Sequence, residues 1–323
     1  MSGGRKAAGC CFALGFSDGR KPFRSLKLKL EYLCEKTTPQ LDENVLPGTI
    51  KSIMAKKDYW NQKVVLVTGG SSGLGLELTT ELIHRGARII IAALEKEAVD
   101  AVVAQLVADG GDVTGFAVDV TSDEDVQNLA IEVCERFGRL DALINVAGRT
   151  DRGKIEFCDA DHFEKVLRLN FLALVRMTHT FLPMLLESEG HVVNIGSLAS
   201  KAASRWTGAY PASKFAVAAY SQQLRLELGP QGLKVLLVCP GPIRRETERL
   251  YPLEGLEDLP ESARRPGAGV KVGKISPQQL VRAILLAAEK NRAELVLPKK
   301  ARILFTLAQL FPTLGDWLIL RNT

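Results

Sequence analysis

The sequence of 323 residues has few aromatic side chains, no Cys-x-x-Cys pair and no long apolar run. No stretch reaches the roughly 18 uncharged apolar residues that a membrane-spanning helix needs, which argues against a transmembrane protein. The cysteines are scattered and no histidine lies at ligand spacing from them, so we expect reduced thiols, a cytoplasmic location and no metal site. The cysteines are Cys10, Cys11, Cys34, Cys134, Cys158 and Cys239.

The sequence also lacks an excess of basic residues outside its first 57 positions. The net charge is +5, but residues 1–57 hold 11 Lys and Arg against 5 Asp and Glu, and the remainder holds 31 against 32. A nearly neutral body lacks the basic surface that nucleic-acid binding requires. We therefore predict no nucleic-acid partner.

Beyond these absences, short β-rich runs alternate regularly with segments of helical period from Lys63 onward. The runs are VVLVTGG, RIIIAA, VTGFAVDV, ALINVAG, HVVNIGS and KVLLVCP. Strands that alternate with helices predict an α/β fold, here a single Rossmann-type doubly wound parallel sheet with helices on both faces. We place this domain at residues 54–298.

Residues 1–53 differ from this domain, because Gly, Lys and Arg dominate their beginning and prolines follow. They are predicted to form a flexible basic extension with one helix around FRSLKLKLEYL; alternatively, translation starts at Met54. An apolar patch after Arg5 and Lys6 is similar to a signal peptide, but the following SDGRK offers no cleavage site of small residues.

Residues 299–323 combine Lys299, Lys300 and Arg302 with two short apolar stretches separated by Pro312. The pattern is too short to span a bilayer and predicts an amphipathic segment. Two interpretations fit it equally: a segment that lies on a membrane surface, and a helix that packs on the domain or on a partner subunit.

The stretch VVLVTGGSSGLGLELTTELIHRG predicts a strand, a turn and a helix in immediate succession. The strand covers Val64 to Thr68, and the helix runs from Leu74 to Arg85. Glycines allow the backbone to approach a pyrophosphate closely, and the helix N-terminus presents unpaired N–H groups to it. The turn therefore predicts a dinucleotide site built on Gly69, Gly73 and Gly75.

The pattern Tyr-x-x-x-Lys occurs three times, beginning at Tyr32, Tyr59 and Tyr210. Tyr32 falls in the N-terminal extension, and Tyr59 with Lys63 precedes the first strand, where no helix aligns the pair. Tyr210 and Lys214 lie in a helical segment downstream of the glycine-rich turn, one helical turn apart on the same face. This third pair is the candidate for chemistry.

Several motifs, taken in order, resemble those of the short-chain dehydrogenase/reductase family between Lys63 and Pro240. They are TGGSSGLG, NVAG at 145–148, Asn170 in LRLNFLALV, Ser197 in VVNIGSLAS, Tyr210 with Lys214, and CPGPI at 239–243. The resemblance implies an NAD(P)-dependent oxidoreductase that transfers a hydride between nicotinamide and a ketone or secondary alcohol. It also implies a homodimer or homotetramer.

The same resemblance implies two sets of functional residues. The catalytic set is Asn170, Ser197, Tyr210 and Lys214. In the cofactor-binding set, Asp119 occupies the position that usually contacts the adenine. That set comprises Thr68, Gly69, Ser71, Ser72, Gly73, Leu74, Gly75, Ala93, Asp119, Val120, Asn145, Ala147, Gly148, Tyr210, Lys214, Pro240, Gly241 and Ile243.

Reduction of a ketone requires a proton for the developing alkoxide, and a free tyrosine phenol has a pKa near 10. An ammonium at Lys214 beside Tyr210 favours the phenolate form. Ser197, thirteen residues before Tyr210 at the end of a strand, can donate to the substrate oxygen as charge develops there. The family implies that Asn170 anchors a water that relays protons to Lys214, which also bonds to the nicotinamide ribose.

The end of the second strand bears on the choice between NADP and NAD. An NAD-specific Rossmann site usually carries Asp or Glu there, whereas this sequence has Ala93 followed by Leu94. The missing carboxylate favours NADP, although neither Leu94 nor Ser72 supplies the cation that usually attracts the 2′-phosphate.

Two positions depart from the family pattern. Val146 replaces the second Asn of Asn-Asn-Ala-Gly, and Arg245 stands where many members have a Thr that holds the nicotinamide carboxamide, a contact that Thr247 or the backbone would have to replace. These departures keep open a second hypothesis, a non-catalytic nucleotide-binding sensor or scaffold with the same fold.

The substrate side of the sequence is less informative. Residues 244–274 interrupt the alternating pattern and predict a loop that covers a small-molecule carbonyl or alcohol. Its arginines are either solvated charges or an anion site. An apolar or lipid-like substrate is expected if residues 299–323 contact a membrane.

Overall fold

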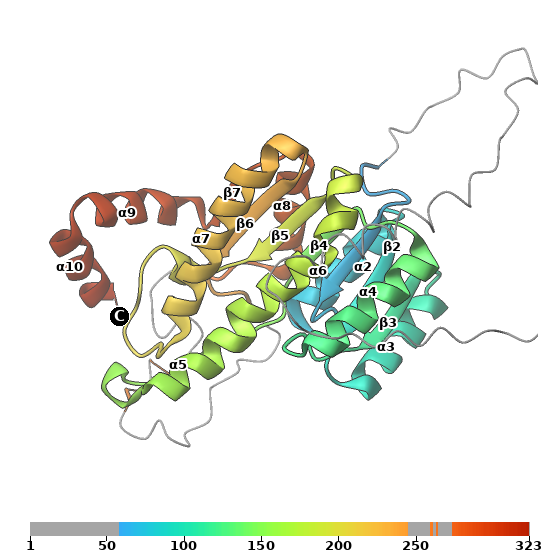
Figure 1. The fold of residues 1–323 in the computed structure, drawn as a ribbon. Coiled ribbons are helices and arrows are strands. Elements are labelled where there is room, and N and C mark those ends of the chain that lie inside the picture. The colour runs from blue at the N-terminus through green and yellow to red at the C-terminus, as the bar shows by residue number, and fades with distance from the viewer. Residues whose placement is uncertain (1–57, 245–258, 261–262, 264–272, 323) are drawn as a thin grey trace, which may run out of the picture. The chain divides into compact units, whose positions relative to one another are not determined.

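A seven-stranded parallel sheet forms the centre of the protein (Figure 1). The computed structural model describes residues 58–244, 259, 260, 263 and 273–322. The strand order β3-β2-β1-β4-β5-β6-β7 confirms the predicted doubly wound α/β fold. The strands are β1 Val64–Thr68, β2 Arg88–Ala93, β3 Val113–Ala117, β4 Ala142–Asn145, β5 His191–Ile195, β6 Lys234–Pro240 and β7 Glu294–Leu297.

Helices cover both faces of this sheet, as predicted. Along β2, Ile89 and Ile91 belong to the apolar core on one face, whereas Ile90 belongs to the core on the other, because successive side chains of a strand point to opposite faces. Burial on both sides explains why RIIIAA is a continuous apolar run. On one face lie α2 Gly73–His84, α3 Lys96–Ala108 and α8 Pro277–Glu289; on the other lie α4 Asp123–Phe137, α6 Ala173–Glu187 and α7 Tyr210–Leu228.

The helix α4 shows how local sequence sets element boundaries. The Ser122 hydroxyl accepts a hydrogen bond from the Asp125 N–H and so caps the N-terminus. Acidic residues fill the first turn, where they complement the helix dipole. The helix ends at Gly138, whose left-handed φ of 67° suits a residue without a Cβ atom.

One described helical segment, Ala160–Glu187, is long and apolar enough to cross a membrane by length and composition alone. It comprises α5 Ala160–Leu167, a π-helical turn at Arg168–Leu172, and α6. Met177, Phe181 and Leu185 in α6 are buried against the sheet. These buried side chains of α6 account for part of the apolar character of the segment, of whose most apolar window 44% is buried.

The C-terminal residues form two helices, α9 Lys299–Leu310 and α10 Pro312–Asn322, with the break at the predicted Pro312. Ala301 is buried and Phe305 packs against the core beside β7. The two helices contact each other closely, since a Cβ atom at Gly315 would lie 2.7 Å from the Cβ of Ala308. Most of their large apolar side chains are exposed, as is Phe311 between the helices; those in the helices are Ile303, Leu307, Leu310, Leu314, Trp317 and Leu320.

Several predictions concern residues outside the described part of the chain. These are the flexible extension at 1–53, the start at Met54, the pair Tyr32 and Lys36, most of the loop 244–274, and the roles of Arg245 and Thr247.

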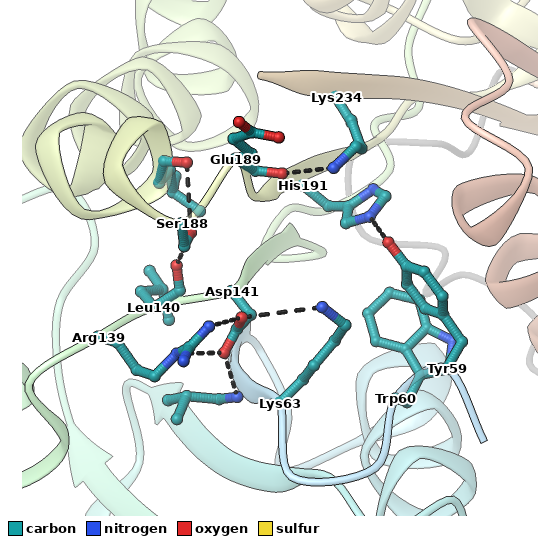
Figure 2. Close-up of polar contacts among 12 residues, drawn as sticks. Tyr59, Trp60, Lys63, Arg139, Leu140, Asp141, Ser188, Glu189, His191 and Lys234 are labelled. Carbon is teal, nitrogen blue, oxygen red and sulfur yellow. Dashed lines mark hydrogen bonds and ion pairs between the residues drawn. The ribbon is translucent and has the colours of Figure 1, made fainter. Parts of the chain in front are cut away.

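The pair Tyr59 and Lys63 precedes β1 and lies at the amino ends of the strands, at the edge opposite the residues predicted for catalysis. Figure 2 shows the pair with His191 and Asp141. The Lys63 ammonium is 4.8 Å from the Tyr59 ring centroid. A hydrogen bond of 2.6 Å joins the Tyr59 hydroxyl and His191 Nε2. The buried Asp141 carboxylate accepts from the Val64 N–H at 2.9 Å and also pairs with Lys63. The second Tyr-x-x-x-Lys pair is thus part of a structural cluster.

Acid should weaken this cluster through His191. Burial, aided by the positive charges of Lys234 and Lys63, lowers the pKa of His191 from 6.5 to about 4. The stabilisation from keeping His191 neutral is therefore complete above pH 6.5 and lost as the pH falls toward 4. Protonation of His191 should therefore lower the free energy of unfolding by roughly 3 kcal/mol between pH 6.5 and pH 4.

Urea unfolding between pH 7 and pH 4 tests this expectation. His191→Gln should show a shallower decrease than the wild type, whereas His84→Gln, at an exposed histidine that ends α2, should match the wild type. Equal slopes for wild type and His191→Gln would contradict the assignment.

Candidate functional site

The predicted site residues meet at the carboxyl ends of the strands, which lie along one edge of a parallel sheet. Thr68 ends β1 and Ala93 ends β2, while Asn145 ends β4. The others follow their strands within a few residues: Asp119 and Val120 after β3, Gly148 after β4, Ser197 after β5, and Gly241 and Ile243 after β6. The topology therefore gathers residues that are far apart in the sequence.

The glycine-rich turn, predicted to bind a dinucleotide, brings the backbone that follows β1 close to α2. A Cβ atom at Gly75 would lie 2.1 Å from the Gly69 carbonyl oxygen, so only glycine permits this close approach of helix and turn. The first residue of α2, Gly73, has a φ of +50° and open space around it. Ser72 caps the helix without a side-chain hydrogen bond to it. The N-terminus of α2 thus presents its N–H groups to an anion such as a pyrophosphate.

The Thr68 hydroxyl braces the NVAG segment. It accepts hydrogen bonds from the N–H groups of Val146 at 3.0 Å and Ala147 at 3.1 Å. The backbone at Val146 is therefore held without the Asn side chain that the family pattern has at this position.

The side chain of Asn145, predicted to bind cofactor, lies inside the core. Its amide nitrogen donates to Thr178 Oγ1 at 3.2 Å and to Asn194 Oδ1 at 2.9 Å. Asn194 in turn donates to the buried Ser221 hydroxyl. This side chain therefore joins β4 to β5 and α6.

Asn170 lies in the π-helical turn between α5 and α6, where it is 1% exposed. Its Oδ1 accepts from the Arg149 N–H at 2.8 Å, and its Nδ2 donates to the Arg149 carbonyl at 2.9 Å and to Ser213 Oγ at 3.1 Å. A π-turn widens the helix and is frequent at functional sites. Asn170 thus fixes the chain just after the NVAG segment. The hydrogen bond between Asn170 and Ser213 was not predicted from the sequence.

Tyr210 and Lys214 lie in the first turns of α7, as predicted. Lys214 is 6% exposed and its ammonium lies 5.7 Å from the Tyr210 ring centroid. The ammonium donates to the Ile195 carbonyl at 2.8 Å, at the end of β5. Burial lowers the pKa of Lys214 from 10.5 to about 8, so the side chain is mostly protonated at pH 7.

Gly148 lies close to the side chains of both Lys214 and Asn170. A Cβ atom at Gly148 would lie 2.9 Å from Asn170 Oδ1 and 3.8 Å from the Lys214 ammonium. Both polar groups therefore face the same point of the backbone, which only a glycine leaves open.

Ser197 follows β5 and begins the short 3-10 helix Leu198–Ser200. Its hydroxyl accepts from the Ala199 N–H at 3.1 Å, and its own N–H donates to Ser200 Oγ at 3.1 Å. The helix α7 packs against this turn. Ser197 is thereby fixed in a turn that packs against α7.

Around the predicted adenine end, the Asp119 carboxylate accepts from the N–H and the hydroxyl of Thr121 at 2.8 and 2.7 Å. At the end of β2, Ala93 is buried and Leu94 is 64% exposed. No carboxylate occupies these two positions. At the predicted nicotinamide end, the Gly241 N–H donates to the Leu297 carbonyl of β7, and Ile243 pairs with Ile275.

Comparisons with known proteins agree with this geometry. The family model described as short chain dehydrogenase matches residues 63–252. The mitochondrial D-beta-hydroxybutyrate dehydrogenase of Mus musculus is 32% identical over 234 residues, covering 68% of this chain and 67% of that protein. A short-chain dehydrogenase from Streptomyces avermitilis has a TM-score of 0.66 and 29% identity, covering 81% of this chain and 98% of that one.

Another solved structure is a variant of actinorhodin polyketide ketoreductase with NADPH, with a TM-score of 0.63 and 27% identity over 75% of this chain and 97% of that one. The chain belongs to the short-chain dehydrogenase family and is an oxidoreductase that acts on CH–OH or C=O groups with NAD or NADP.

Proposed function

We propose that the protein transfers a hydride between NADP and a ketone or secondary alcohol, with Asn170, Ser197, Tyr210 and Lys214 as its catalytic residues. One observation carries the proposal: the buried Lys214 ammonium lies on the same helix face as Tyr210 and beside Gly148, which precedes the Arg149 backbone that Asn170 holds. Burial of a charged lysine is costly unless the charge is paired or hydrogen-bonded, and the Ile195 carbonyl accepts a hydrogen bond from this ammonium. The charge held in this way can stabilise a phenolate at Tyr210.

In the proposed reaction, different residues would bind the cofactor, transfer the proton and stabilise the developing charge. The turn 69–75, with the N-terminus of α2, holds the pyrophosphate of the cofactor, whose nicotinamide supplies or accepts the hydride when bound. The Tyr210 phenol gives its proton to the carbonyl oxygen, and the Lys214 ammonium stabilises the phenolate that remains. The Ser197 hydroxyl donates to the same oxygen as negative charge develops. Asn170 holds the backbone that faces Lys214.

NADP is the proposed cofactor because Ala93 and Leu94 place no carboxylate against a 2′-phosphate. The polyketide ketoreductase structure with NADPH supports this preference.

A panel of ketones and secondary alcohols, followed by nicotinamide absorbance with both cofactors, tests the reaction. We expect NADPH to give the higher kcat/KM. Tyr210→Phe should reduce kcat/KM by at least about a hundredfold, since general acid catalysis is lost, and should leave NADPH binding intact. Tyr59→Phe is the matched control, because it removes the hydroxyl of the second Tyr-x-x-x-Lys pair at the opposite edge of the sheet.

Full turnover in Tyr210→Phe would refute the catalytic assignment. A wild type that binds NADPH but turns over nothing in the panel would favour the sensor or scaffold hypothesis.

We further propose that α9 and α10 lie on an anionic membrane surface and that the substrate is apolar or lipid-like. Six large apolar side chains of these helices are exposed, as is Phe311 between them; Leu310 and Ile303 are exposed by 67% each and Trp317 by 51%. The same helices carry Lys299, Lys300, Arg302 and Arg321 against one acidic residue, Asp316. Exposed apolar groups beside an excess of positive charge suit an anionic lipid surface.

Co-sedimentation with phosphatidylcholine vesicles, with and without phosphatidylserine, tests this contact. We expect binding that rises with phosphatidylserine and is lost on deletion of 299–323 or in Leu310→Ser/Trp317→Ser. Leu226→Ser is the control, since Leu226 in α7 is also 67% exposed. Unchanged membrane fractionation after the deletion would remove the proposal.

We also propose that the protein is cytoplasmic and forms a homodimer or homotetramer, with vesicle binding as a peripheral contact. If a second copy covers α9 and α10 instead of a membrane, the Leu310→Ser/Trp317→Ser variant will change the mass in light scattering and vesicles will not bind.

A further inference from the structure

The segment Gly148–Gly153 lies between Asn170 and the start of α7, and hydrogen bonds join it to both. Asn170 bonds to the N–H and the carbonyl of Arg149. Gly153 pairs with Thr207, three residues before Tyr210, through hydrogen bonds to Trp206 and Gly208. The segment therefore links two of the proposed catalytic residues through the backbone.

Asp151 forms the central link. Its carboxylate Oδ2 accepts from the Ala209 N–H at 2.8 Å and lies 2.7 Å from His162 Nε2 of α5. Its Oδ1 accepts from the Arg152 N–H at 2.9 Å. The Asp151 side chain is 13% exposed and that of His162 is 36% exposed. A carboxylate with this many directed donors is held in one orientation.

Gly208 is shaped to receive this carboxylate. Its φ is +50°, and a Cβ atom there would lie 2.2 Å from Asp151 Oδ2. Any other residue would push the carboxylate away from the chain that leads into α7. The contact between Asp151 and the residue before Tyr210 thus depends on glycine at position 208.

The N-terminus of α7 has no cap of its own. Ala209 is the N-cap residue and cannot form a side-chain hydrogen bond to the helix. The Asp151 carboxylate, from a segment 58 residues earlier, instead fixes the Ala209 N–H and places negative charge where the helix dipole favours it. Ala209 itself is fully buried. Asp151 therefore holds the backbone at the residue before Tyr210, whose own N–H donates to the Thr207 carbonyl at 3.1 Å.

We propose that Asp151, held by His162, is a positioning residue that aligns the Tyr210 phenol with Lys214 and the substrate. The proposal rests on the proposed catalytic role of Tyr210. Misplacement of a reacting group by about 1 Å can cost a hundredfold in rate, so a carboxylate that fixes the backbone next to Tyr210 has a direct effect on turnover.

The test compares Asp151→Ala with Asp151→Asn. Both remove the charge, but only Asn keeps an oxygen that accepts from the Ala209 N–H. Asp159→Asn is the matched control, because this exposed carboxylate caps α5 through the His162 N–H and does so equally well as an amide.

The first readout is reduction of phenanthrenequinone by NADPH. We expect kcat to fall roughly ten- to a hundredfold in Asp151→Ala, with the Kd for NADPH unchanged, and to recover most of this loss in Asp151→Asn. Asp159→Asn should behave as the wild type. An unchanged kcat in Asp151→Ala, or an equal loss in both Asp151 variants, would overturn the proposal.

The second readout needs no substrate. In protein labelled with ¹³Cζ-tyrosine, with the Tyr210 signal assigned by Tyr210→Phe, NMR titration gives the pKa of the phenol. We expect it to be higher in Asp151→Ala than in Asp151→Asn by about 0.5, since the phenol is less well placed against the Lys214 ammonium. Equal values would overturn the proposal.

These two readouts separate the positioning role from the proposed function. If the wild type reduces nothing, the proposed reaction fails for this substrate while the titration still decides the role of Asp151. If Asp151→Ala does not fold, His162→Ala, which removes only the partly exposed partner, should show the same effects to a smaller degree; no effect there would overturn the proposal.

Discussion

The Lys214 side chain places an ammonium inside the protein, where it donates to the Ile195 carbonyl at 2.8 Å, and several features of the carboxyl edge depend on that charge. Desolvation of the ammonium lowers the pKa of Lys214 to about 8. The charge therefore needs polar groups close to it that still leave room for the side chain. Gly148 leaves that space open and Asn170 holds the adjacent backbone. The Tyr210 ring lies within reach of the same charge. With an apolar residue at position 214, Tyr210 would have no ammonium beside it and the Ile195 carbonyl would lose this donor.

The two edges of the sheet use similar residues for different purposes. At the amino edge, Tyr59 and Lys63 form a cation–π contact and take part in a cluster with His191 and Asp141 (Figure 2). At the carboxyl edge, α7 aligns Tyr210 with Lys214, whose ammonium lies near Gly148 of the NVAG segment. Because the same sequence pattern gives a structural contact in one place and a proposed catalytic pair in the other, position in the fold decides what it does.

Local signals made much of the fold and site predictable. The turn with Gly75, the strand RIIIAA and the helix that aligns Tyr210 with Lys214 are each encoded within about 20 residues. The strand β7 was not predicted, because ELVL is short and begins with Glu294, which pairs with Lys201. Asp151 was missed because its contact with Ala209 crosses 58 positions and leaves no local pattern. Asn145 stays a predicted cofactor residue, and the hydrogen bonds of its amide nitrogen to Thr178 and Asn194 were not predicted because they join elements 33 and 49 positions apart.

The central claim is that the buried Lys214 ammonium prepares the Tyr210 phenol for proton transfer. The most direct test is the pKa of that phenol in protein labelled with ¹³Cζ-tyrosine, compared between the wild type and Lys214→Met, which keeps an unbranched side chain but removes the charge. The account predicts a pKa about 1 or more higher in Lys214→Met, since a nearby opposite charge favours the phenolate. The same pKa in both proteins would contradict it.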